Sequence, residues 1–234
     1  MPDPACWRPS NTETIYECST WTPREEYDVF LAASPHEMED YLRIQLAQDA
    51  TARITAGYCW RWSKDTDRDG NLRKDIVIGD WRRPWNAGKK YARKRIPGPA
   101  SWATDPAGFE QVGCIYTAQS FEWDYAGLII GPDYVWRDGQ WVASKNKDHN
   151  MRGVHGVQLH EVVRNIYRTL ATRGVRGTIL YSADEQTQRM LTQAGIPQLG
   201  EEIERLTTSP AYREWHVASH VKLRLPKPSA DQLF

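Results

Sequence analysis

Short apolar runs alternate along this chain with amphipathic segments that carry helix-capping residues, and this alternation restricts the fold more than any other feature. In residues 159–173 apolar side chains recur at intervals of three and four residues, which predicts an amphipathic helix. Residues 177–181 predict a strand, and Ser182-Ala183-Asp184-Glu185 predicts a capping box that opens another helix. This order indicates an α/β fold: a mainly parallel sheet with helices on both faces.

Local signals predict further elements. Ser34-Pro35-His36-Glu37 forms a capping box for a helix to about residue 49. Asp138-Gly139 predicts a type I′ hairpin within residues 134–143. We expect Gly174 to end the preceding helix in a left-handed cap. Strands are predicted at residues 27–32, 53–60, 75–79, 111–116 and 126–131, and the last run is apolar enough for a strand covered on both faces.

Composition indicates a soluble globular protein. The chain has 234 residues, a net charge of zero and 26% charged residues, which argues against a charged disordered chain. No apolar stretch approaches the roughly 18 residues of a membrane span, and no secretory signal is visible, so we expect a cytoplasmic location. We divide the chain into a leading segment (1–26), a main domain (27–196) and a C-terminal appendage (197–234), in which residues 216–225 suggest an edge strand.

A basic region follows an acidic one. Residues 1–50 hold ten acids and three bases, whereas residues 51–104 hold thirteen bases and five acids. No acid occurs from Trp81 to Thr104, where bases interleave with aromatic rings. This pattern predicts a groove for single-stranded nucleic acid, and a solvated loop whose tryptophans pack on the domain explains it equally well. The residues expected to contact nucleic acid here are Arg82, Arg83, Trp85, Lys89 and Lys90.

We predict neither a metal site nor a cysteine nucleophile. Asp65-Thr66-Asp67-Arg68-Asp69-Gly70 resembles the start of a calcium loop, but Ile76 occupies the position that needs a chelating glutamate. A solvated turn between strands is the better interpretation. Cys59 and Cys114 lie in apolar runs, which favours buried thiols over reactive ones.

Two polar segments at the ends of predicted elements form the most specific pattern. Thr117-Ala118-Gln119-Ser120-Phe121-Glu122-Trp123-Asp124 connects two predicted strands, and Leu170-Ala171-Thr172-Arg173-Gly174 ends the long amphipathic helix. These segments resemble motifs V (T-x-Q-G-x-E-x-D) and VI (L-T-R) of superfamily 1 helicases. The chain is similar to the bacterial Schlafen-type, group 3-like helicase and ATPase domain over about residues 27–190, with further matches at residues 56–60, 102–106, 112–114 and 131–133.

The resemblance implies a RecA-like second helicase lobe and roles for individual residues. It implies that Arg173 acts as an arginine finger on the γ-phosphate of ATP and that Glu122 helps to hold the nucleotide sugar. It places Thr117 and Gln119 near the nucleic-acid backbone and the catalytic cleft. The finger role requires the guanidinium to project into an open cleft beside Glu122. A helix-terminal cation favoured by the helix dipole is the alternative for Arg173.

The chain departs from the family pattern in two ways. Ser120 stands where motif V usually has glycine, which would hinder a close backbone approach to phosphate. The sequence also lacks the phosphate-loop pattern G-x-x-x-x-G-K-[ST] and an apolar strand that ends in an Asp-Glu pair for magnesium. We therefore expect the chain to begin after the first lobe, and ATP with magnesium to bind only together with a partner lobe.

Three functions remain open at this stage. The preferred one is a second lobe that completes the ATP site of another chain and contacts DNA or RNA. The second is a module that keeps the fold and binds single-stranded nucleic acid without catalysis. The third is a protein-interaction lobe, because a lobe without its mate exposes the surface that normally faces the cleft.

Overall fold

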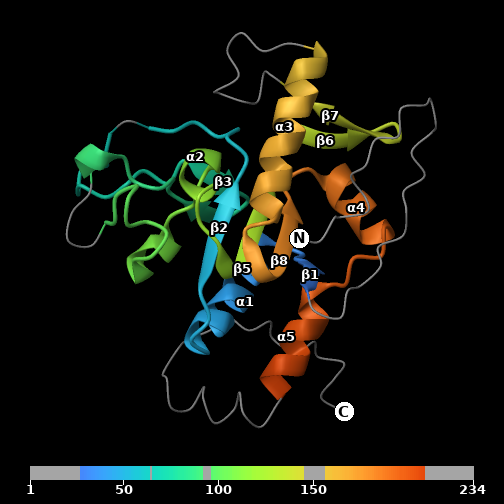
Figure 1. The fold of residues 1–234 in the computed structure, drawn as a ribbon, viewed down its shortest axis with the longest axis horizontal. Helices are drawn as coiled ribbons and strands as arrows, with labels where there is room; N and C mark the ends of the chain where they lie inside the picture. The colour runs from blue at the N-terminus through green and yellow to red at the C-terminus, as the bar shows by residue number, and fades with distance from the viewer. Residues whose placement is uncertain (1–26, 64, 92–95, 145–155, 209–234) are drawn as a thin grey trace.

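A computed structural model describes residues 27–63, 65–91, 96–144 and 156–208 of the protein. Four parallel strands form its central sheet in the order β1 (Asp28–Leu31), β8 (Gly174–Ser182), β5 (Trp123–Ile130) and β2 (Ala52–Ala56). All strand pairs in this sheet are parallel, and helices flank it (Figure 1). The α/β fold class predicted from the sequence is confirmed, and it is consistent with a RecA-like lobe.

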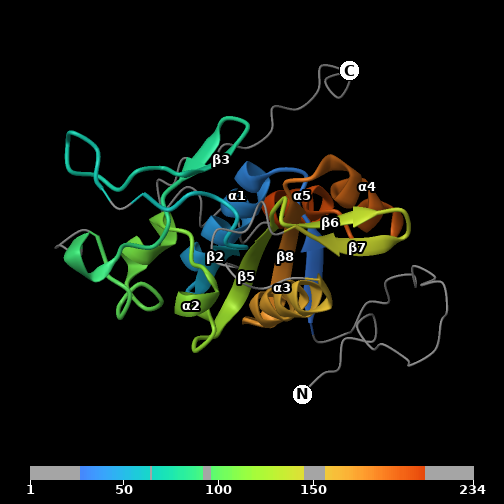
Figure 2. The same cartoon turned by 90° about the horizontal axis from the view of Figure 1, so that it is seen from above.

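Helices cover both faces of this sheet (Figure 2). On one face, α1 (Pro35–Ala47) packs with α5 (Leu199–Thr208), and Met38 and Leu42 of α1 approach Gly127 of β5. On the other face, α3 (Gly156–Ala171) packs on β5. Because successive side chains of a strand point to opposite faces, β5 contributes to both hydrophobic cores, and six consecutive residues from Tyr125 to Ile130 are buried.

The helix starts show how local sequence places these elements. Ser34 caps α1, its hydroxyl accepting the Glu37 amide at 3.1 Å, as predicted. The prediction that Ser182 is the N-cap of the following helix is wrong by two residues. Asp184 is the N-cap of α4 (Glu185–Gln193), and its carboxylate accepts the Thr187 amide at 2.8 Å. Arg137 also donates to Asp184, so this residue joins α4 to the neighbouring hairpin.

The hairpin predicted around Asp138-Gly139 is confirmed. Strands β6 (Tyr134–Arg137) and β7 (Gln140–Ala143) pair antiparallel. Asp138 and Gly139 have φ angles of 49° and 79°, as a type I′ turn requires.

A long insertion of residues 57–122 separates β2 from β5. It contains the two-stranded hairpin β3 (Ile76–Ile78) and β4 (Trp81–Arg83), the short 3₁₀ helices η1 (Lys89–Tyr91) and η2 (Pro106–Glu110), and the single-turn helix α2 (Ile115–Ala118). The strand expected at residues 111–116 is wrong in its second half. Val112 and Gly113 form isolated bridges, and α2 then begins because the Thr117 hydroxyl accepts the Cys114 amide at 3.2 Å.

Gly174 does not form the predicted left-handed cap, since it is the first residue of β8. Its lack of a side chain matters for another reason: a Cβ there would lie 1.9 Å from the Gly177 carbonyl oxygen. A carbonyl at the end of α3 accepts a hydrogen bond from a side chain instead. Thr178 donates its hydroxyl to the Ala171 carbonyl at 2.8 Å, and the Tyr27 hydroxyl lies 2.7 Å from the hydroxyl of Thr178.

The core of the sheet domain extends beyond residue 196. The Leu31 amide donates to the Pro197 carbonyl at 2.8 Å, and Leu199 and Ile203 of α5 are buried against the α1 side of the sheet. Residues 197–208 therefore share a core with residues 27–196. The edge strand predicted at residues 216–225 and the leading segment 1–26 lie outside the described residues. Within the described part of the chain, every helix is too short or too polar to cross a membrane.

Candidate nucleotide and nucleic-acid sites

The two segments singled out in the sequence meet at the amino ends of β5 and β8. Trp123 is in register with Gly174, and the Trp123 amide donates to the Arg173 carbonyl at 2.9 Å. Nη1 of Arg173 lies 3.7 Å from Oε1 of Glu122. Residues about fifty positions apart in the chain are thus held together at the amino ends of two neighbouring strands of the sheet.

The Arg173 guanidinium is held by acceptors of the protein itself. Its Nε donates to the Thr169 carbonyl at 2.9 Å, and Nη1 donates to the carbonyls of Gln119 and Phe121 at 3.2 and 3.4 Å. Nη2 lies 3.2 Å from the Thr172 hydroxyl. The side chain is 16% exposed, whereas that of Glu122 is 61% exposed. Arg173 therefore fastens the α2–β5 turn to the end of α3 and does not project freely into an open cleft.

The other predicted motif V residues differ in how accessible they are. Gln119 is exposed and uses its main-chain carbonyl to hold Arg173. The Thr117 hydroxyl is committed within the fold, because it caps α2 and donates to Oδ1 of the fully buried Asn86 at 3.0 Å. Of the predicted motif residues, Glu122 and Gln119 are thus the exposed ones.

The aromatic residues of the basic segment are inside the protein. Trp81, Trp85 and Trp102 are each at most 2% exposed. The Trp85 indole donates to the Arg61 carbonyl at 3.2 Å, and its ring stacks with Trp62 at 5.8 Å between centroids. Trp85 therefore has no free face for a nucleic-acid base, and packing on the domain accounts for these rings. The half-buried rings at this place are Tyr58 and Trp62, which the sequence analysis did not select.

Among the basic residues of the same segment, some form ion pairs within the fold and others do not. Arg83 donates to Glu39, so its charge is neutralised inside the fold. Arg82 and Lys89 are exposed and form no ion pair within the part of the chain that the structure describes. The Lys90 side chain lies outside the described structure.

Glu39 is the centre of a buried polar cluster that ties the insertion to α1. Its side chain is 7% exposed and accepts hydrogen bonds from Arg43 at 2.7 Å, from the Trp81 indole at 2.8 Å and from Arg83. Burial raises the pKa of this carboxyl, but the two arginines and the indole together outweigh burial and hold the pKa below its usual value. Glu39 is therefore a structural anion.

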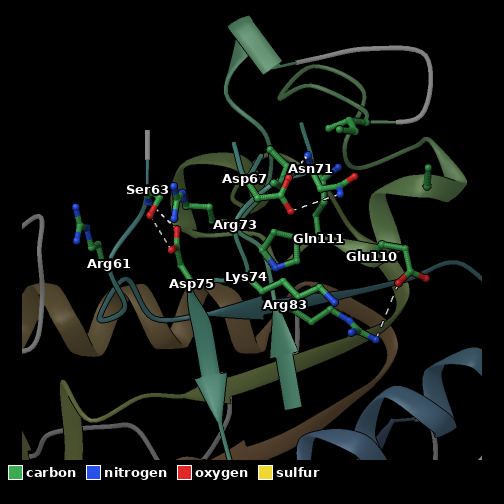
Figure 3. A pocket seen from close by; sticks show the side chains of 14 residues that line it. Arg61, Ser63, Asp67, Asn71, Arg73, Lys74, Asp75, Arg83, Glu110 and Gln111 are labelled. Carbon is green, nitrogen blue, oxygen red and sulfur yellow. Dashed lines mark hydrogen bonds and ion pairs between the residues drawn. The ribbon is translucent and has the colours of Figure 1, made fainter. Parts of the chain in front are cut away.

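A broad hollow of about 850 Å³ opens on the insertion (Figure 3). Its lining includes the neutral polar residues Ser63, Asn71 and Gln111. It also includes four cations, Arg61, Arg73, Lys74 and Arg83, and three acids, Asp67, Asp75 and Glu110. Sequence reasoning missed Arg61, Arg73 and Lys74 because it concentrated on residues 81–104. The excess of bases over residues 51–104 was the signal that could have found them.

The Asp65–Gly70 segment is a turn. Oδ1 of Asp67 accepts the amides of Asp69 and Asn71 at 3.0 and 2.8 Å, and Thr66 bridges Leu72. In the described ranges, no group of three His, Cys, Asp or Glu side chains is placed to hold a metal ion. Cys59 and Cys114 are buried thiols that form no disulfide among the described residues, and their burial is as predicted. Burial raises the pKa of the Cys114 thiol, which favours the unreactive protonated form.

Comparison with known families gives this geometry its context. The sequence model of the family described as "Schlafen group 3, DNA/RNA helicase domain" matches residues 11–184, which is more than half of the chain and includes both motif segments. The chain belongs to this Schlafen group 3 family. The family description indicates a helicase-like domain whose function is related to nucleic acid.

A curated relative extends the similarity to a eukaryote. The Schlafen group 3 domain is 27% identical to an uncharacterized protein of Saccharomyces cerevisiae, YPL245W, over 38% of this chain and 22% of the yeast protein. The aligned part thus spans about a fifth of that relative's length. No solved structure matches the chain.

Proposed function

We propose that this Schlafen group 3 domain is the second lobe of a nucleic-acid-dependent ATPase or helicase. The observation that carries the proposal is the meeting of Arg173 with Glu122 at the edge where β5 and β8 begin, in a chain whose family match spans both segments. In this proposal Arg173 becomes the arginine finger only when its guanidinium leaves the Gln119 and Phe121 carbonyls for a phosphate, because in this structure it does not project into an open cleft. Glu122 and Gln119 would then lie beside the nucleotide. ATP and its magnesium ion are held by a phosphate-loop lobe that this sequence does not contain.

The contacts of Arg173 support this role in one respect and restrict it in another. Hydrogen bonds to the Gln119 and Phe121 carbonyls keep the guanidinium beside the motif V segment, and the same bonds must be exchanged before it can meet a phosphate. Among the described residues, its ion-pair partner is Glu122, which is exposed and lies 3.7 Å away. A nucleotide phosphate would displace this carboxylate from the guanidinium, and the sugar hydroxyls would then donate hydrogen bonds to Glu122.

The experiment is ATP hydrolysis by the domain alone and with a candidate phosphate-loop lobe, each with and without single-stranded DNA or RNA. We expect no turnover from the domain alone, because its sequence lacks the pattern G-x-x-x-x-G-K-[ST]. We expect nucleic-acid-stimulated turnover when the lobe is added. Strong hydrolysis by the domain alone would overturn the proposal of a shared site.

One observation favours a second candidate, a binding module without catalysis. The Arg173 guanidinium already has hydrogen-bond acceptors on all three nitrogens, so its structural role is complete without a nucleotide. Such a module would bind single-stranded nucleic acid with a steep salt dependence and would show no turnover with any phosphate-loop partner.

A further inference from the structure

Three exposed cations line the hollow on the insertion without a carboxylate in salt-bridge contact among the described residues. Arg61, Arg73 and Lys74 are exposed and line the hollow (Figure 3), and none of them forms an ion pair in the described ranges. Other arginines of the domain do have carboxylate partners. Arg43, Arg137, Arg189 and Arg205 all form ion pairs at 3.1 Å or less.

The acids of the hollow, in contrast, already accept hydrogen bonds or form an ion pair within the protein. Both oxygens of Asp75 accept from Ser63, at 2.6 Å from its amide and 2.8 Å from its hydroxyl. Oδ1 of Asp67 accepts the two amides of its own turn. Glu110 pairs with Arg43 at 2.8 Å. The acids thus shape the walls, and the groups with donors left for a ligand are the three cations.

Two half-buried rings belong to the same part of the insertion. Tyr58 and Trp62 lie in the segment that carries Arg61, and each packs on the buried Trp85, at 5.5 and 5.8 Å between ring centroids. Trp85 holds these rings from behind. An unpaired base can stack on a fixed, partly exposed ring, whereas the bases of a duplex are already stacked on one another.

We infer that this hollow binds the phosphate backbone of single-stranded DNA or RNA through Arg61, Arg73 and Lys74. The inference rests on the proposed function and locates its nucleic-acid contact on residues 58–75, away from Trp85 and Arg83. The hollow is open to solvent and so admits a passing strand, whereas sites for small ligands enclose most of the ligand surface. The chemical groups that the site recognises are regularly spaced phosphates, and a nucleic-acid strand supplies them.

The test is binding of a fluorescent oligothymidylate to the domain across a salt series, without nucleotide or partner lobe. We compare wild type with the triple variant Arg61→Gln, Arg73→Gln, Lys74→Gln. Each lost phosphate contact lowers the log–log salt slope by about 0.7 for a single strand. The triple variant is therefore expected to lose about two units of slope and on the order of 100-fold in affinity at 0.1 M salt.

A matched control removes the same charge elsewhere. Arg168, Arg189 and Arg205 are exposed on α3, α4 and α5, and the triple variant Arg168→Gln, Arg189→Gln, Arg205→Gln is expected to bind like wild type. Equal losses in both triple variants would overturn the site, because a general charge effect would then explain binding. Ultraviolet cross-linking of wild type to oligothymidylate needs no variant; it should label peptides within residues 58–75, and labelling confined to other regions would contradict the inference.

Competition identifies the source of the phosphates. Inorganic phosphate and ATP should displace the oligonucleotide only weakly, whereas duplex DNA of equal length should bind less tightly than the single strand. Displacement by ATP at least as effective as by unlabelled oligonucleotide would overturn the inference in favour of a nucleotide site. The direct binding assay contains neither ATP nor a partner lobe, so a failure of the shared ATP site and a failure of the hollow are separate results.

Discussion

Replacing Arg173 by alanine is expected to lower ATP turnover of the domain assembled with a phosphate-loop lobe on the order of 10³-fold, as measured by phosphate release at saturating ATP. The physical reason is that a guanidinium beside the γ-phosphate stabilises charge that develops in the transition state. Neither Glu122 nor Gln119 carries a cation that could replace it.

The design of this test must separate chemistry from folding, because Arg173 also holds the α2–β5 turn through the two carbonyls of Gln119 and Phe121. Arg173→Lys keeps a positive charge and loses the planar fork, so it should preserve assembly while turnover falls. Arg168→Ala, at an exposed position on the same helix, serves as the control and should keep wild-type turnover. An assembled Arg173→Lys complex that hydrolyses ATP at the wild-type rate would contradict the finger role.

Replacing Glu39 by alanine is expected to destabilise the domain by about 3 to 5 kcal/mol, as measured by urea unfolding at pH 7. Removing one member of a buried ion pair leaves the partner charges without compensation, and here Arg43, Arg83 and the Trp81 indole lose their common acceptor. Glu110→Gln is the matched control. That residue is 57% exposed, so its loss should cost less than about 1 kcal/mol.

The lowered pKa of Glu39 also predicts a pH dependence. A carboxyl whose pKa is depressed on folding adds stability above its unfolded pKa of about 4.3, and this stability is lost as pH falls through the folded value. The difference in unfolding free energy between wild type and Glu39→Gln should therefore be largest near neutral pH and shrink below about pH 4. A difference that stays constant down to pH 3 would mean that the carboxylate charge has no part in the cluster.

The elements that could be predicted from the sequence are those whose cause is local. The Ser34 cap and the Asp138-Gly139 turn each depend on residues within a few positions, and both form as predicted. The apolar run of β5 predicted an interior strand because both of its faces must be covered. Local information was ambiguous where Cys114 starts a helical turn, since the same residues suit a strand or a capped helix.

The contacts that sequence could not supply join distant residues. Glu39 reaches Arg83 across 44 positions, so nothing near Arg83 indicated that its charge is committed. Trp85 resembles a base-stacking residue in the sequence, and its burial depends on Tyr58 and Trp62 lying over it. The proximity of Glu122 to Arg173 came from a family resemblance, and the acceptors that hold the guanidinium are backbone carbonyls, whose positions depend on the tertiary fold.

The most direct test of the shared ATP site is photo-cross-linking with an ATP analogue that carries the reactive group on its γ-phosphate, applied to the domain together with a phosphate-loop lobe. The account predicts label in peptides that contain residues 115–123 or 169–178, dependent on the added lobe and reduced by excess ATP. Label found only elsewhere on the domain, including residues 58–75, would contradict the account, because the γ-phosphate would then not approach Arg173.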